Sequence, residues 1–169
     1  MIENTILVTG APRSGTTPLG QLVSMLPGAV DLYEPMGPTG DRAIANRFPM
    51  PGEEGFSVDD LSDFVARMQR LSMKFKSQVR PGHRGFKGFI AQTIGTRSLL
   101  SYYRAKFTPN KKLLVWKDPH GVFCAPLAAR AGFKAVVTMR PPHAHAASFK
   151  RLGWVSRLQE IYPRYCAAF

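Results

Sequence analysis

Cysteine and long apolar stretches are both scarce in this chain of 169 residues. Its two cysteines, Cys124 and Cys166, are too few for a disulfide framework, so we expect a reducing compartment, the cytoplasm. No apolar run approaches the roughly 20 residues that span a bilayer, which predicts a protein without a transmembrane helix. The first residues, Met-Ile-Glu-Asn, contain no basic leader, and this argues against a signal peptide.

Acidic residues are also scarce, but only in the second part of the chain. Residues 1–63 contain nine acids and three bases (net −6), whereas residues 64–169 contain two acids and twenty bases (net +18). A field of this size attracts anions, which include nucleotides, sulfated or phosphorylated glycans, nucleic acid and membrane surfaces. Charge alone does not choose among these partners. The apolar content of 44% is that of an ordinary globular protein, and the length suits a single domain.

Short apolar runs alternate with helical patterns along the chain. Apolar and β-branched runs predict buried strands over residues 5–9, 29–33, 113–116 and 135–139. Apolar residues at helical spacing predict helices over residues 18–26, 57–79, 96–107, 125–129 and 144–152. Residues 35–56 are rich in proline and glycine, which predicts a long loop. The alternation predicts a three-layer α/β fold, in which helices cover both faces of a central parallel sheet of four or five strands.

Charged side chains follow all four predicted strands. They are Arg13, Glu34, Lys117 and Arg140. Ligands of open parallel sheets bind beyond the carboxyl ends of the strands. We therefore expect the functional site at this edge of the sheet.

The first strand leads into the segment Gly10–Thr17, Gly-Ala-Pro-Arg-Ser-Gly-Thr-Thr, and then into a helix. This is nearly the phosphate-binding loop G-x-x-x-x-G-K-[ST], with Thr16 in place of the lysine. Backbone N–H groups of such a loop and of the helix behind it hold phosphate oxygens. Without the lysine, a nucleotide triphosphatase loses its main contact to the β- and γ-phosphates, whereas Arg13 supplies a positive charge from another direction. The alternative interpretation is a tight turn without a ligand.

Two motifs together carry a family resemblance. The residues Pro12, Arg13, Ser14, Gly15, Thr16 and Thr17 resemble the 5′-phosphosulfate loop of sulfotransferases that use 3′-phosphoadenosine 5′-phosphosulfate (PAPS). The 3′-phosphate motif of that family, an arginine that ends a strand and a serine eight residues later, is matched by Arg140 and Ser148. The resemblance implies a P-loop-type core. It covers about residues 5–152, so we expect residues 1–169 to form one sulfotransferase-like domain, either compact or lacking the usual C-terminal part.

Two weaker matches suggest catalytic groups. Lys117-Asp-Pro-His120 resembles the Lys-Thr-His or Lys-x-Pro segment of the family, which implies that Lys117 contacts the transferring sulfuryl group. Glu34-Pro35 resembles the Glu-Pro of carbohydrate-directed members, which implies that Glu34 is the base, and His120 competes for that role. The alternatives are an ordinary lysine at a strand end and a surface carboxylate beside a turn.

The resemblance implies PAPS as the sulfuryl donor, adenosine 3′,5′-bisphosphate as the product, no required metal ion, and an anionic or carbohydrate acceptor. A P-loop ATP-dependent kinase is the alternative enzyme. A polyanion- or nucleic-acid-binding module is the alternative without catalysis, disfavoured because it leaves both motifs as accidents. The basic stripe at residues 67–84 is typical of a solvated helix face, and contact with the inner surface of a membrane stays open as a further interpretation. His143 and His145 lack the neighbouring ligands of a metal site.

Overall fold

The computed structural model describes residues 2–44, 49–50, 56–78 and 95–153. These residues form a four-stranded sheet with the strand order β2-β3-β1-β4, in which every pair of neighbours is parallel. The strands are β1 (Asn4–Gly10), β2 (Ala29–Tyr33), β3 (Leu113–Lys117) and β4 (Lys134–Thr138). All four strands predicted from the sequence are confirmed, to within one residue at each end. Because the strands are parallel, their carboxyl ends lie at the same edge of the sheet.

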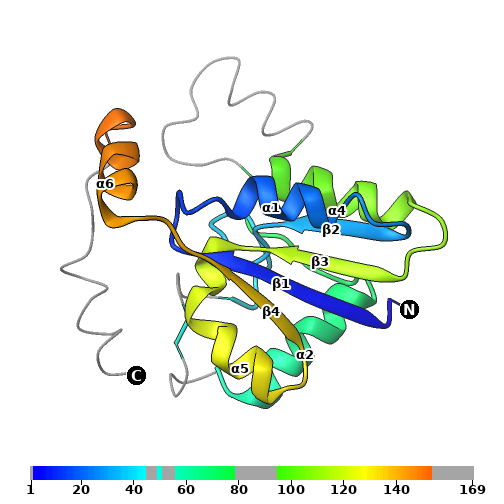
Figure 1. The fold of residues 1–169 in the computed structure, drawn as a ribbon. Helices are drawn as coiled ribbons and strands as arrows, with labels where there is room; N and C mark the ends of the chain where they lie inside the picture. Colours follow the sequence, from blue (N-terminus) through cyan, green and yellow to red (C-terminus); the bar gives the residue numbers. More distant parts are fainter. Residues whose placement is uncertain (1, 45–48, 51–55, 79–94, 154–169) are drawn as a thin grey trace.

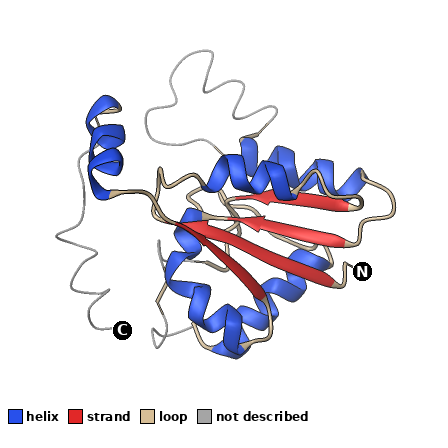
Figure 2. Cartoon of the chain, viewed as in Figure 1, coloured by secondary structure: helices blue, strands red, loops and turns tan. Residues whose placement is uncertain are grey.

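Helices cover both faces of this sheet (Figures 1 and 2). One face carries α1 (Thr16–Val23) and α4 (Arg97–Phe107), and the other carries α2 (Val58–Gln69) and α5 (Ala125–Arg130). A 3₁₀ turn, η1 (Pro119–Cys124), leads from β3 into α5, and α6 (Pro142–Arg151) lies beyond the carboxyl end of β4. The predicted three-layer α/β architecture is therefore confirmed. None of the described helices combines the length and the apolar character that crossing a bilayer needs.

Apolar side chains of the strands and of α2 form the core. Trp116 of β3 is fully buried and meets Phe64 of α2 edge to face, with ring centroids 5.5 Å apart. Leu7, Leu32 and Leu114 come from three different strands and are also buried. Edge-to-face packing of this kind places the positive ring edge on the negative face of the neighbour. The core thus binds α2 to the centre of the sheet.

The predicted helix over residues 57–79 is too long. It begins as predicted, because the Ser57 hydroxyl accepts a hydrogen bond from the Asp60 N–H and the Asp60 carboxylate accepts one from the Ser57 N–H. It ends at Gln69, where the chain turns through Leu71 with a φ of +49°. Phe75 then pairs with Asp41 in an antiparallel bridge, so its apolar side chain belongs to a strand-like contact rather than to the helix. Residue 79 lies outside the described residues.

The helices that follow β1 and β3 lie on opposite faces of the sheet (Figure 1). The chain passes from β1 into α1 on one face, and from β3 through η1 into α5 on the other. Open α/β sheets bind ligands beyond the carboxyl ends of adjacent strands that have this arrangement. In this chain those strands are β1 and β3, which continue into the loop after Gly10 and the segment after Lys117.

Candidate functional site

The loop between β1 and α1 has a backbone that favours close approach by an anion. Gly10 has a φ of +146°, and a Cβ there would lie 2.3 Å from the carbonyl oxygen of Thr138, so only glycine fits against β4. Arg13 has a φ of +74°, and Gly15 precedes α1 with a φ of +109°. Gly15 provides no side-chain cap to α1, and a Cβ placed on it would meet no atom within 4 Å. The positive end of the α1 dipole therefore faces open space.

The two predicted phosphate-binding motifs meet in this structure. The Arg13 Nε–H donates a hydrogen bond to the Ser148 hydroxyl at 3.2 Å, and an Arg140 Nη1–H donates to the Arg13 carbonyl oxygen at 3.4 Å. Ser148 is buried, whereas both arginines are exposed. Two guanidinium groups thus lie at the entrance to the loop. Such groups bind phosphate oxygens through charge-assisted and often bidentate hydrogen bonds.

His145 joins the same cluster, a contact that the sequence interpretation missed. Its imidazole Nε2 lies 2.6 Å from the Pro12 carbonyl oxygen, and Phe149 packs edge to face against the ring. His145 precedes Ser148 by three residues on α6, and residues at this spacing share one helix face. That spacing is the signal that would have identified His145 as a neighbour of the loop.

Of the remaining loop residues, Ser14 contacts β4, and Thr16 and Thr17 form the start of α1. The Ser14 hydroxyl lies 2.6 Å from the Thr138 hydroxyl, which in turn donates to the Thr9 carbonyl oxygen at 3.1 Å. Thr16 is buried and Thr17 half-buried at the start of α1. The predicted loop residues Pro12 to Thr17 thus form one continuous structure that links β1, β4 and α6.

Lys117 and Glu34 form an ion pair at the ends of β3 and β2. Lys117 Nζ lies 2.9 Å from Glu34 Oε1, and it also lies 3.7 Å from the centre of the Tyr33 ring. The two side chains are only 4% and 18% exposed. The lysine stem passes against Gly20 of α1, where a Cβ would approach Lys117 Cγ to 2.7 Å. Gly20 therefore leaves the room that this buried lysine occupies.

Asp118 holds His120 and the start of the loop after β2. One Asp118 carboxylate oxygen accepts from the His120 N–H at 2.9 Å and lies 3.1 Å from His120 Nδ1. The other oxygen accepts from the Met36 N–H at 2.6 Å. Successive side chains at a strand end point to opposite faces. Lys117 accordingly contacts α1, whereas Asp118 contacts η1 on the other side of the sheet.

The structure therefore brings together some predicted site residues and separates others. Arg13, Arg140 and Ser148 form one cluster, and Glu34 and Lys117 form a second. His120 belongs to a third group, fixed by Asp118. Gly20 was not predicted to leave room for Lys117, nor Asp118 to bind the Met36 N–H, because these contacts join distant parts of the chain. The contact from Asp118 to His120 is local and was also missed.

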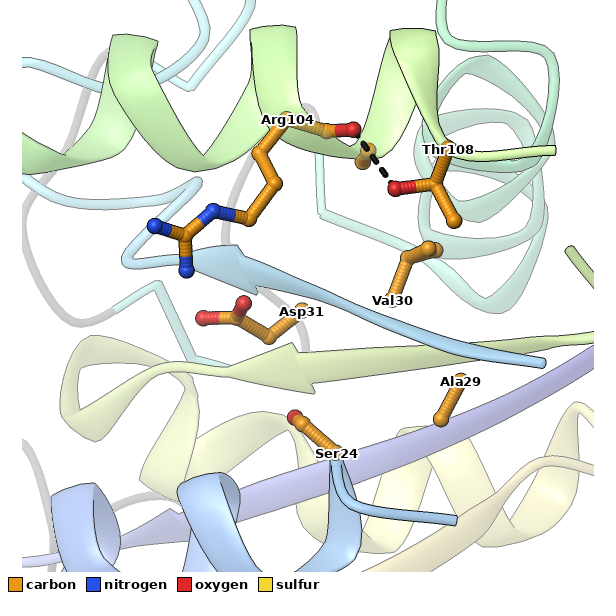
Figure 3. Close-up of a pocket in the computed structure, with 7 residues that line it drawn as sticks. Ser24, Ala29, Val30, Asp31, Arg104 and Thr108 are labelled. Atoms are coloured by element: carbon orange, nitrogen blue, oxygen red, sulfur yellow. Dashed lines mark hydrogen bonds between the residues drawn. The ribbon is translucent and has the colours of Figure 1, made fainter. Parts of the chain in front are cut away.

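A cavity of about 150 Å³ lies elsewhere, between α1, β2 and α4 (Figure 3). Its lining includes Asp31 of β2 and Arg104 of α4, and extends to Ala29 at the amino end of β2. No residue of the predicted phosphate-binding motifs lines it. The cavity is thus separate from the predicted phosphate-binding motifs.

Comparisons of the chain with protein-family models, curated proteins and solved structures return no match. Within the part of the chain that the structure describes, no three His, Cys, Asp or Glu side chains gather in one place. The geometry of the two clusters and the motifs that form them are the features of this chain that bear on its function.

Proposed function

We propose that this chain is a PAPS-dependent sulfotransferase domain, which moves a sulfuryl group from PAPS to an acceptor hydroxyl. The observation that carries the proposal is the contact between the two motifs, Arg13 to Ser148, across the carboxyl edge of the sheet. A donor with phosphates at both its 3′ and 5′ positions needs two anion sites close together. The loop before α1 and the Arg140–Ser148 segment supply adjacent sites of this kind.

The residues present fit such a donor. The open space above Gly15 lies at the positive end of the α1 dipole, beside the loop that contains Arg13. Arg13, Thr16 and Thr17 would bind the 5′-phosphate, and Arg140 with Ser148 would bind the 3′-phosphate. When the donor binds, the Arg13–Ser148 hydrogen bond would break, or would persist beside the new contacts to the phosphates. PAPS itself supplies an activated sulfuryl group whose bond to the 5′-phosphate breaks during transfer.

Glu34 is the proposed base, and Lys117 the group that steadies the sulfuryl oxygens. Proton transfer by a positioned side chain requires that the side chain lie within reach of the acceptor hydroxyl. Glu34 lies beside Lys117, so one location provides both a proton acceptor and a positive charge. His120 is held by Asp118 among the residues of η1, which favours Glu34 for this role. Sulfuryl transfer resembles in-line phosphoryl transfer. The protein therefore accelerates it mainly by positioning the reactants and neutralising their negative charge.

The position of Asp118 is the observation in favour of the alternative function, a P-loop kinase, because an aspartate after a strand holds Mg²⁺ in many P-loop enzymes. Both Asp118 carboxylate oxygens accept backbone hydrogen bonds in this structure, from His120 and Met36. Thr16 also replaces the loop lysine that contacts the β- and γ-phosphates. These two observations favour a bisphosphate over a nucleoside triphosphate.

Thermal unfolding with adenosine 3′,5′-bisphosphate, AMP, ATP with Mg²⁺ and an oligonucleotide tests the proposal. The bisphosphate should raise Tm most, since a ligand at 100 times its Kd adds about 2.7 kcal/mol to stability. An equal or larger shift with ATP and Mg²⁺ would favour the kinase, and one confined to the oligonucleotide would favour a polyanion-binding module.

The proposed acceptor is a hydroxyl on a carbohydrate or a glycolipid. The support is the Glu34-Pro35 resemblance together with the net charge of +18 after residue 63, which suits an anionic or extended acceptor. Transfer of labelled sulfate from PAPS onto panels of sugars and phenols tests this part separately. Transfer to phenols alone would contradict the acceptor class while leaving the sulfotransferase proposal in place.

A further inference from the structure

Two helices on one face of the sheet expose large apolar side chains. Ten such side chains are exposed among the described residues, and six of them belong to α4, to α1 or to the turn after α1. These six, which we call the α1–α4 face, are Leu22, Met25, Leu26, Leu100, Tyr103 and Phe107. Met25 and Phe107 are 79% and 80% exposed. Because α1 and α4 cover the same face of the sheet (Figure 1), all six lie on elements of one side of the protein, and several exposed apolar groups on one side mark an interaction surface more often than isolated ones do.

The helix α4 has buried residues on one side and exposed apolar residues on the opposite side. Its buried residues, Ser98, Tyr102 and Ala105, face the interior of the protein. Leu100, Tyr103 and Phe107 follow one another at spacings of three and four, so they form a stripe. At 100° per residue, this stripe lies on the side of the helix opposite the buried residues. The fold itself therefore leaves the stripe without a partner among the described residues.

The two aromatic rings of the stripe form a flat unit. The rings of Tyr103 and Phe107 are stacked, with centroids 6.5 Å apart and planes inclined by 19°. Tyr103 is 46% exposed. Tyrosine is enriched at the boundary between water and lipid because its ring is apolar and its hydroxyl is polar, and phenylalanine inserts more deeply.

Positive charge surrounds the stripe. Residues 95–117 contain six bases and no acid. Lys117 is buried in its ion pair with Glu34, which leaves the remaining five cations on and after α4: Arg97, Arg104, Lys106, Lys111 and Lys112. Arg104, Lys106 and Lys112 are exposed. A surface that combines apolar side chains with positive charge complements the acyl chains and phosphates of an anionic membrane.

We propose that the α1–α4 face docks on the surface of a bilayer that contains anionic lipids. In this arrangement Phe107 and Met25 enter the boundary between headgroups and acyl chains, and Lys106, exposed in the last turn of α4, contacts lipid phosphates, whereas Arg104 points toward Asp31 in the cavity (Figure 3). Two copies of the chain pressed together through this face would place like charges against one another, which opposes self-association. Nucleic acid would use the cations but would leave Leu22, Met25 and Leu26 without stacking partners.

Docking in this orientation leaves the candidate active site accessible. Arg97 at the start of α4 lies over the Tyr33 ring, at the carboxyl end of β2. Thr108 after α4 lines the same cavity as Ala29, at the amino end of β2. Phe107 therefore lies toward the amino edge of the sheet, whereas the loop after Gly10 lies at the carboxyl edge. The proposal does not depend on which reaction that loop serves.

Co-sedimentation with vesicles tests the proposal directly. The protein should bind vesicles of phosphatidylcholine mixed with phosphatidylglycerol, and much more weakly those of phosphatidylcholine alone. Phe107→Ser should weaken binding about tenfold or more, because a buried phenylalanine contributes most of its transfer free energy. Lys106→Gln should weaken it about fivefold, since each cation near an anionic surface contributes roughly that factor. Added salt should reduce the binding of the parent protein.

Two control variants distinguish this face from other surfaces. Met139→Ser changes a side chain that is 89% exposed but lies after β4, and Arg130→Ala removes an exposed cation at the end of α5, on the opposite face of the sheet (Figure 1). Both should retain vesicle binding, and circular dichroism should show that every variant is folded. Absence of binding to the mixed vesicles would overturn the proposal, as would an equal loss in Met139→Ser. A dimer in analytical ultracentrifugation that Phe107→Ser converts to a monomer would assign the face to self-association instead.

Discussion

The Nε–H of Arg13 donates a hydrogen bond to the hydroxyl of Ser148, a residue 135 positions later in the chain. Arg13 belongs to the loop after β1, and Ser148 to the helix after β4. The contact exists because β1 and β4 are parallel neighbours in the sheet, so the segments that follow them begin at the same edge. Two motifs that resemble the two phosphate sites of one enzyme family therefore form one cluster.

Arg140→Ala should remove the preference for adenosine 3′,5′-bisphosphate over AMP. The guanidinium of Arg140 is exposed beside the loop, and a hydrogen bond to a charged group contributes about 1.5–3 kcal/mol, roughly 10- to 150-fold in affinity. Isothermal titration calorimetry with both nucleotides measures the preference. Arg130→Ala, which removes an exposed cation at the end of α5, should leave it unchanged. An unchanged preference in Arg140→Ala would refute the assignment of the 3′-phosphate motif.

Glu34→Gln should reduce turnover by about 10²–10⁴-fold, the usual contribution of positioned proton transfer. Bisphosphate affinity should change little, because Glu34 contacts Lys117 rather than the phosphate loop. His120→Asn should reduce turnover less. Steady-state rates with PAPS and an accepted sugar, together with calorimetry, provide both readouts. If His120→Asn loses activity while Glu34→Gln keeps it, the base is His120.

Gly20→Ala should displace Lys117 and lower stability by about 1–3 kcal/mol, the usual cost of an added group in a filled space. The new Cβ would lie 2.7 Å from Lys117 Cγ, so the lysine has to leave its place beside Glu34 or α1 has to shift. Urea denaturation measures the loss. Gln21→Ala, at an exposed position of the same helix, is the matched control and should be nearly neutral. Equal stability of the two variants would show that the lysine adjusts without strain.

Removal of Asp60 should destabilise the protein at neutral pH but not in acid. The Ser57 backbone N–H and hydroxyl donate to the Asp60 carboxylate and lower its pKa. A carboxyl whose pKa is lower in the folded state adds stability above its unfolded pKa of about 3.9, and loses it as the pH falls through the folded value. The stability difference between the parent protein and Asp60→Ala should therefore shrink below about pH 4.

Chemical denaturation across a pH series measures this difference. Asp59→Ala is the control, since Asp59 lies in the same first turn of α2 and experiences the same helix dipole. A gap between the two variants that stays constant from neutral to acid pH would contradict the role of the capping hydrogen bonds.

The sequence by itself determined the order and kind of the elements and the edge of the sheet where the motifs lie. Runs such as residues 5–9 and 113–116 are apolar or β-branched and end at Gly10 and Lys117, and these signals are local. The same is true of the start of α2, where Ser57 and Asp60 cap each other at a separation of three residues. Parallel strands then place Arg13 and Arg140 at the same edge without further information.

Only the tertiary structure decided which side chains at that edge contact one another. Glu34 pairs with Lys117 across 83 positions, in a space that Gly20 of a third element leaves open. Asp118 binds His120 through one carboxylate oxygen and the Met36 N–H, 82 positions away, through the other. The exposed stripe on α4 likewise differs from the buried one only because the sheet covers a single side of the helix. A periodic pattern of apolar residues involves residues that are close together in the chain, and it predicts their backbone conformation. Contacts across 80 to 135 positions depend instead on the packing of the whole sheet.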